Sequence, residues 1–164
     1  MFKVNDHVVY PGHGVGTITK SELKEIFGKT QQFYTVEIAD SKMKIMVPES
    51  NLEGTGLRKV STKGEIEKVF KTLAPSKILD QRTWNMRYRE LMEKIKSGEF
   101  REVCDALVSI NNMKVKGELS FGERKLLEVA YWLIVNEVQL AYVLQKDNAE
   151  EFVTERMKLW KVST

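Results

Sequence analysis

The spacing of apolar residues changes near Val60, and this change constrains the fold more than any other feature of the 164-residue chain. Before Val60, apolar side chains recur about every second residue, as in FYTVEI (33–38), which is the period of a β-strand. After Val60 they recur at i, i+3, i+4 and i+7, the period of an amphipathic helix. Six of the ten glycines also precede Val60. The chain is therefore expected to contain a β domain (1–59) followed by a helical domain (60–164).

The β domain is expected to contain about five short strands, with a hairpin turn at Gly28. Five short strands in fewer than sixty residues are too few for a sandwich of two full sheets. A small, strongly bent barrel of the Tudor-like kind fits this length, because closure of the sheet removes vulnerable edges.

The strand MKIMVP (43–48) is expected to present two different faces. Alternation predicts that one face, which holds Met43, Ile45 and Val47, belongs to the barrel core. The opposite face suits a protein partner that docks by strand pairing, and it equally suits an ordinary solvated strand. The residues of that outer face are Lys42, Lys44 and Met46.

The helical domain is expected to be an all-α bundle of about five helices. Ser61 or Thr62 can cap the first helix, and Ser120 with Glu123 forms a capping box at the fourth. A last helix is expected to start at Asp147. Several residues fall on apolar stripes and are expected in the core, among them Leu91, Ile95, Cys104, Leu107, Trp132 and Trp160.

Composition limits the classes of function. The 26 Lys and Arg against 23 Asp and Glu give a net charge of +3, which excludes a highly basic nucleic-acid coat but permits a local basic patch. A single cysteine, Cys104, excludes an internal disulfide and fits a reducing compartment. No apolar run approaches the ~20 residues of a membrane span, and the N-terminus does not read as a signal peptide. We expect a cytoplasmic monomer.

Catalytic and cofactor motifs are weak. The glycines of GHGVG (12–16) precede a strand-like TITK instead of the helix that a phosphate loop needs, so we interpret them as a tight turn. His7, His13 and Cys104 lack the spacing of a zinc site or of a cysteine nucleophile with its histidine. We therefore expect no enzymatic activity, no metal and no cofactor.

The segment DQRTWNMRYREL (80–91) carries the candidate chemistry. Arg82, Arg87 and Arg89 flank Trp84 and Tyr88 at the start of a helix, where arginines and backbone N–H groups suit phosphate oxygens. An aromatic side chain at such a position can wedge against or stack on an unpaired base. The spacing from Trp84 to Tyr88 leaves a core position for the indole open, and the arginines can form a solvated face. A second basic pair, Arg124 and Lys125, opens another helix.

Motifs spread over the whole chain resemble the CarD/CdnL family of bacterial RNA polymerase-binding proteins. They are FKVNDHVVYPGHG near the N-terminus, VPESN and GLR at the end of the β domain, and TWNMRYRE, KSGE and LSFGERKLL in the helical domain. The resemblance implies a Tudor-like domain that binds the polymerase β subunit, and a helical domain that lies on promoter DNA at the upstream edge of the melted bubble. It also implies that a tryptophan wedge in the minor groove hinders collapse of the bubble.

The resemblance also assigns positions. The wedge falls on Trp84, and Arg87, Arg89 and Arg124 match basic positions of the family, with Lys125 beside them. Arg82 and Asn85, which flank Trp84 in the sequence, complete the expected DNA-contacting set. The polymerase-facing strands hold Lys24, Ile26 and Met46, to which the outer face of 43–48 adds Lys42 and Lys44. Met86 and Met46 depart from the family pattern, because basic residues are common at both positions.

We therefore expect a transcription regulator that binds the polymerase β subunit and stabilises the promoter open complex without reading a DNA sequence. Because polymerase supplies local concentration, the low net charge is compatible with this mode of action. The alternative is an interaction module that docks on polymerase or another partner without touching DNA. A nucleic-acid-binding protein independent of polymerase is a further class, which the charge of +3 disfavours.

Overall fold

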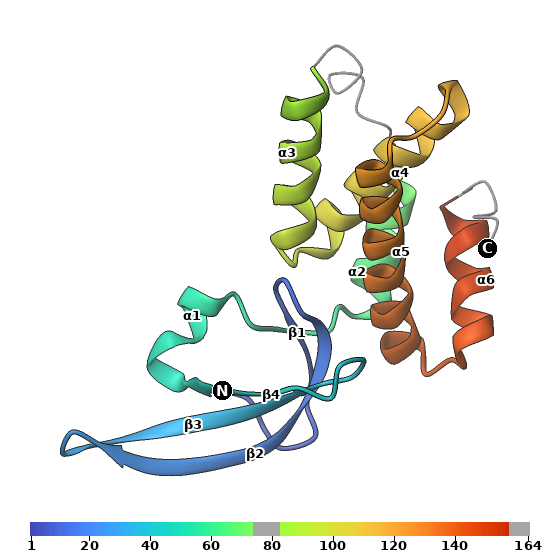
Figure 1. The fold of residues 1–164 in the computed structure, drawn as a ribbon. Helices are drawn as coiled ribbons and strands as arrows, with labels where there is room; N and C mark the ends of the chain where they lie inside the picture. Colours follow the sequence, from blue (N-terminus) through green and yellow to red (C-terminus); the bar gives the residue numbers. More distant parts are fainter. Residues whose placement is uncertain (74–82, 158–164) are drawn as a thin grey trace. The chain divides into compact units, whose positions relative to one another are not determined.

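A computed structural model describes residues 1–73 and 83–157, apart from the side chains of 115 and 116. The chain divides into two compact units, Met1–Val60 and Ser61–Thr164 (Figure 1). The first unit holds strands and the second holds helices, as the change in apolar period predicted. The expected fold class, a small Tudor-like β domain followed by a helical bundle, is confirmed.

The first unit is built on a five-stranded antiparallel sheet with the strand order β4-β3-β2-β1-β5. Its core contains Val8, Ile18, Tyr34, Val36 and Val47, all of which are almost completely buried. A short 3-10 turn and one turn of helix follow β4. The elements are β1 (His7–Tyr10), β2 (Gly14–Ile26), β3 (Lys29–Ile38), β4 (Lys44–Pro48), η1 (Glu49–Asn51), α1 (Leu52–Thr55) and β5 (Arg58–Lys59).

Two glycines explain how the long β2–β3 hairpin forms. A Cβ atom on Gly16 would lie 2.7 Å from the carbonyl oxygen of Glu37, so only glycine permits this approach of the two strands. At the tip, Phe27 and Gly28 both have positive φ angles, of 51° and 74°, as in the two-residue turns that match strand twist. The expected hairpin at Gly28 is confirmed.

The second unit contains five helices within the described part of the chain. Thr62 and Glu65 form a capping box at the first of them, and Ser120 and Glu123 form the predicted box at the fourth. The last helix begins at Lys146 after Gln145, so the expected start at Asp147 is one residue late. The helices are α2 (Lys63–Lys71), α3 (Trp84–Lys96), α4 (Phe100–Lys116), α5 (Phe121–Tyr142) and α6 (Lys146–Arg156).

Helix α5 is central to the bundle, because it packs against each of the other four helices (Figure 1). Leu91 and Ile95 from α3, together with Cys104 and Leu107 from α4, are buried against it as predicted. Trp132 is only partly buried at the edge of this core, where the Nζ of Lys146 lies 4.5 Å from its ring centroid. Trp160 lies outside the described residues.

Candidate nucleic-acid interface

The starts of α3 and α5 meet in the helical unit, although 36 residues separate them along the chain. The indole Nε1–H of Trp84, the first residue of α3, donates a 3.1 Å hydrogen bond to the Oγ of Ser120, which caps α5. One turn further along α3, Arg87 pairs with Glu123 of α5. These contacts tie the exposed end of α3 to the first turn of α5.

The carboxylate of Glu123 is the centre of this junction. It is buried, with 3% of the residue exposed, and it accepts hydrogen bonds from the backbone N–H and the Oγ–H of Ser120, both at 3.0 Å. Its other oxygen accepts from Nε and Nη2 of Arg87, at 3.1 and 2.7 Å. Burial raises the pKa of this carboxyl, but the hydrogen bonds from Ser120 and Arg87 outweigh burial, so the pKa lies below its ordinary value of 4.5. The group is therefore an anion that helps to hold two helices together.

Trp84 is half-exposed, with 47% of its surface open to solvent. One face of the indole stacks on the ring of Tyr88, with centroids 5.4 Å apart and planes 20° from parallel. A Cβ atom on Gly122 would lie 3.1 Å from Cε2 of Tyr88 and 3.8 Å from Cζ2 of Trp84, so the glycine makes room for both rings. The sequence left open whether Trp84 is a core residue or an exposed one. In the structure, one side of its indole is packed and the other side is open to solvent.

The predicted basic residues fall into different environments. Arg89 and Arg124 are exposed, and Lys125 is exposed with its Nζ 5.2 Å from the ring centroid of Phe121. Arg87 is largely enclosed, with 21% of its side chain exposed, and its charge is paired with Glu123. The structure thus gives Arg87 a positioning contact, where the sequence suggested a free cation. Asn85 is exposed on the first turn of α3, and Arg82 lies outside the described residues.

Two exposed apolar side chains belong to the same helix starts. The sequence did not single out Phe121, and it marked Met86 only as a departure from the family pattern. Phe121 is 70% exposed at the first position of α5, and Met86 is more than half exposed on the first turn of α3. The signal for Phe121 was available, because a residue directly after the capping serine lies on the outermost turn of its helix. The exposed side chains at the starts of α3 and α5 are called the helix-start patch, which consists of Trp84, Asn85, Met86, Phe121, Arg124 and Lys125.

The β unit brings four of the five predicted polymerase-contacting residues to one face of its sheet. The registers of β2 with β3 and of β3 with β4 place Lys24, Ile26, Lys44 and Met46 on the same side. The Nζ of Lys24 lies 3.5 Å from the Sδ of Met46 and 3.2 Å from a carboxylate oxygen of Glu22. Met46 is about half-exposed, so this side combines mobile apolar atoms with cations.

Two expectations for the segment before β4 were wrong. Lys42 lies in the turn between β3 and β4 with a φ of 59°, and not on the outer face of the strand. Met43 is exposed and not part of the core. The cause is a tight connection in which Lys42 N–H bonds to the carbonyl of Ile38, and the Ile38 N–H to that of Met43, so alternation starts only at Lys44.

The residues considered for metal binding or catalysis have structural surroundings. His7 Nδ1 lies 3.2 Å from the Oγ1 of Thr17, and His13 packs edge-on against the ring of Tyr10. Cys104 is fully buried, and burial raises the pKa of its thiol well above the usual 9.0. Among the residues that the structure describes, no group of three or more His, Cys, Asp or Glu side chains is placed to hold a metal ion.

Within the same described residues, no single helix is long and apolar enough to cross a membrane. The helices α5 and α6 pass that test of length and composition only as a pair, and the pair is bent by 112°.

Comparison with known proteins gives matches along nearly the whole chain. The family model described as "CarD-like/TRCF RID domain" matches residues 2–61, and that described as "CarD, C-terminal domain" matches residues 68–154. A protein of Bacillus subtilis (strain 168) named "Putative transcription factor YdeB" is 29% identical over 155 residues, which cover 93% of this chain and 99% of that protein.

Two solved structures match part of the chain. The solution NMR structure of the 72-residue N-terminal domain of Myxococcus xanthus CarD is 34% identical, with a TM-score of 0.32, and the match covers 36% of this chain and 79% of that one. The CdnLNt structure from the same organism is 38% identical, with a TM-score of 0.33, and the match covers 38% of this chain and 89% of that one.

Proposed function

Since the chain belongs to the CarD family of transcription regulators that interact with RNA polymerase, as its motifs predicted, we propose a specific mode of action. The β unit binds the polymerase β subunit. The helical unit contacts promoter DNA at the upstream edge of the melted bubble, where Trp84 acts as a wedge that slows closing of the bubble. The wedge itself and the cations around it read no DNA sequence.

The observation that carries this proposal is the state of Trp84. Its indole is half-exposed at the outermost turn of α3 and is held there by Tyr88 and Ser120. A fixed aromatic surface loses little conformational entropy when a base stacks on it. Base–aromatic stacking contributes about 1–3 kcal/mol, which changes an equilibrium by roughly one to two orders of magnitude.

The charges around Trp84 support weak attraction without sequence readout. Arg89, Arg124 and Lys125 are exposed cations near two helix starts, where the helix dipoles also favour phosphate. Three such cations on a chain of net charge +3 give a low intrinsic affinity for DNA. Docking of the β unit on polymerase compensates by raising the local concentration of the helical unit at the promoter.

The docking surface proposed for the polymerase is the common face of Lys24, Ile26, Lys44 and Met46. Strand β4 is an edge of the sheet, so its outer backbone groups are available for pairing with a partner strand. The face of cations and a flexible thioether beside that edge suits a partner with acidic and apolar side chains.

The open-complex lifetime on a ribosomal RNA promoter tests the proposal. With the cognate polymerase, the wild-type protein is expected to lengthen the lifetime, and Trp84→Ala is expected to remove most of that effect. Trp132→Ala is the matched control, because it removes a partly buried indole of the same unit away from the helix-start patch. Equal lifetimes with wild type and Trp84→Ala, when both bind polymerase, would refute the wedge.

A second candidate function is docking on a protein partner without DNA contact, and the exposed Phe121 and Met86 favour it because apolar side chains also suit a protein surface. Charge reversal at Arg89 and Lys125 separates the two candidates. DNA contact predicts a shorter open-complex lifetime for these variants than for the wild type. A purely protein contact predicts an unchanged lifetime. Arg87 is unsuitable for this test, since its reversal breaks the pair with buried Glu123.

A further inference from the structure

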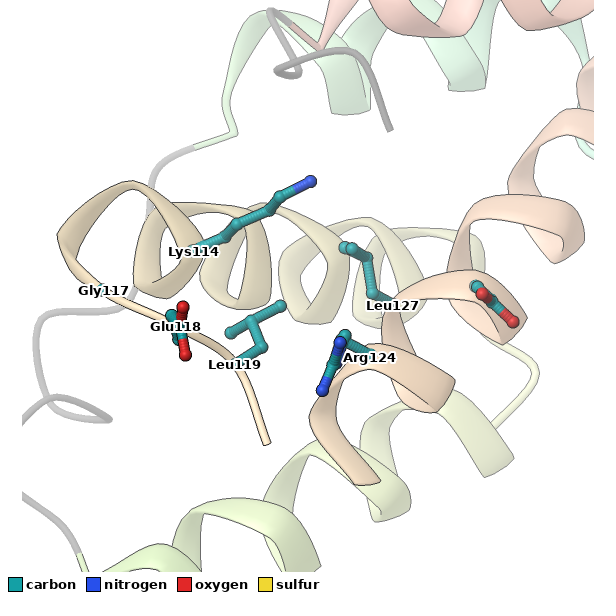
Figure 2. Close-up of a pocket in the computed structure, with 7 residues that line it drawn as sticks. Lys114, Gly117, Glu118, Leu119, Arg124 and Leu127 are labelled. Carbon is teal, nitrogen blue, oxygen red and sulfur yellow. The ribbon is translucent and has the colours of Figure 1, made fainter. Parts of the chain in front are cut away.

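A pocket of about 420 Å³ opens between the end of α4 and the first half of α5 (Figure 2). The buried side chains of Leu119 and Leu127 give it apolar walls. Charged side chains of both signs complete the lining: Lys114, Glu118, Arg124 and Glu128.

These four charged groups are available to a ligand. Within residues 1–73 and 83–157, none of their side chains takes part in a hydrogen bond or an ion pair. This contrasts with the adjacent Arg87 and Glu123, whose charges satisfy each other. The pocket therefore combines apolar walls with cations and carboxylates that have no partner among the described residues.

The mixed lining restricts the chemistry of the ligand. A simple anion would meet repulsion from Glu118 and Glu128, and a simple cation from Lys114 and Arg124. An apolar ligand would desolvate all four charges without replacing their hydrogen bonds to water. A nucleotide meets every requirement, because its flat base packs on leucines, its phosphate pairs with cations, and an exocyclic amine donates to a carboxylate.

The position of the pocket connects it to the helix-start patch. Arg124 belongs to both, and it follows Phe121 by three residues on α5, which is an axial rise of about 4.5 Å. Because Arg124 lies one helical turn after Phe121 and also lines the pocket, a DNA strand that lies on the helix-start patch passes the opening of the pocket at Arg124.

We propose that this pocket takes one unpaired base of a DNA strand, of the kind that carries an exocyclic amine, together with its phosphate. The proposal rests on the DNA contact of the proposed function. Adenine, cytosine and guanine carry such an amine, whereas thymine does not. An unpaired base enters a pocket at low cost, because no base pair has to be broken.

Titration of the full-length, ¹⁵N-labelled protein with single nucleotides tests the pocket directly. Deoxycytidine monophosphate is expected to shift the amides of Lys114, Gly117 and Leu119, and to bind about three- to tenfold more tightly than thymidine monophosphate. Inorganic phosphate alone is expected to leave these amides unchanged. No shift at millimolar deoxycytidine monophosphate, or equal shifts with phosphate, would overturn the proposal.

Charge variants and a short strand sharpen the test. Lys114→Glu is expected to weaken binding about tenfold. Lys20→Glu, an equal charge change on an exposed strand residue of the other unit, is expected to leave binding unaltered. A deoxycytidine trinucleotide is expected to bind more tightly than the mononucleotide, and the opposite order would overturn the assignment to a DNA strand in favour of a free nucleotide.

The titration contains neither polymerase nor promoter. Its failure would leave the effect of Trp84→Ala on open-complex lifetime as it stands, and a failed lifetime experiment would not alter the nucleotide-induced shifts.

Discussion

Replacing Glu123 with glutamine removes the charge of the carboxylate that joins α5 to α3 while keeping its shape. A glutamine at this position still completes a capping box, because its amide oxygen can accept from Ser120. The glutamine amide has only one oxygen, which Ser120 and Arg87 would have to share. If that oxygen accepts from Ser120, the NH₂ group faces Arg87 and cannot accept a hydrogen bond from it. The substitution therefore tests the buried pair and leaves the helix cap in place.

The magnitude follows from the contacts. Glu123 accepts two bonds from Arg87, at 3.1 and 2.7 Å, and its side chain is 4% exposed. Breaking a fully buried ion pair costs about 3–5 kcal/mol, and losing a single hydrogen bond to a charged group costs about 1.5–3 kcal/mol. Because 21% of the Arg87 side chain remains accessible to water, we expect a loss of about 2–3 kcal/mol for Glu123→Gln.

The second capping box of the same unit supplies the control. Glu65 on α2 accepts from Thr62 in the same geometry, but Glu65 is exposed. Glu65→Gln is expected to cost less than about 1 kcal/mol, since the cap survives and the charge contacts of an exposed carboxylate contribute about 0–1 kcal/mol. Comparison of the two variants therefore cancels the contribution of the cap.

Urea denaturation, monitored by tryptophan fluorescence, measures the loss of unfolding free energy in both variants. All three tryptophans, Trp84, Trp132 and Trp160, belong to the helical unit, so the signal reports on that unit alone. In thermal unfolding, the same loss is expected to lower the midpoint of Glu123→Gln by about 8–24 °C, given 4–8 °C per kcal/mol for a domain of this size. If Glu123→Gln lowers the free energy of unfolding by no more than Glu65→Gln does, the Arg87–Glu123 pair makes no net contribution to stability and the reasoning is wrong.

Two further predictions concern pH and packing. Because the pKa of Glu123 is lower in the folded state than its ordinary 4.5, the stability that it contributes is complete above about pH 4.5 and is lost as the pH falls through the folded value. The free energy of unfolding of the wild type should therefore fall more steeply than that of Glu123→Gln between pH 5 and about pH 3, and parallel curves would contradict this. Gly16→Ala should destabilise the β unit by more than about 1 kcal/mol in thermal unfolding, since the new Cβ would lie 2.7 Å from a backbone oxygen of Glu37. Gly64→Ala is its control, because there the nearest atom lies at 4.0 Å and alanine favours the helix, so destabilisation by both variants would refute the steric argument.

The features that the sequence predicted well are local. Ser120 and Glu123 lie three residues apart, so a capping box is recognisable without any knowledge of the tertiary fold. The alternation of residues 33–38 likewise predicts a strand, although β3 begins earlier, at Lys29. The errors at Lys42 and Met43 are also local, but they arise from a turn with a left-handed residue that carries no glycine to signal it.

The arrangement of the candidate site was less accessible to sequence reasoning. Arg87 and Glu123 are 36 residues apart, and no periodicity relates them. Arginines around a tryptophan look equivalent in a sequence, yet Arg87 pairs with a buried carboxylate whereas Arg89 faces solvent. Only the packing of α3 against α5 distinguishes a cation that positions the site from one that can meet a phosphate.

The same packing explains why an exposed tryptophan can be held in one orientation. The Oγ of Ser120 accepts two hydrogen bonds. One comes from the backbone N–H of Glu123 and caps α5, and the other comes from the indole N–H of Trp84. The carboxylate of Glu123 accepts from Ser120 and Arg87 together, so the cap, the ion pair and the indole form one connected network. Loss of Arg87 is tolerated poorly in this network, because it leaves the buried carboxylate of Glu123 without its ion-pair partner. The orientation of the indole at the surface is therefore tied to the folding free energy of the bundle, and weakening of the buried pair should disturb Trp84 before it disturbs the distant α6.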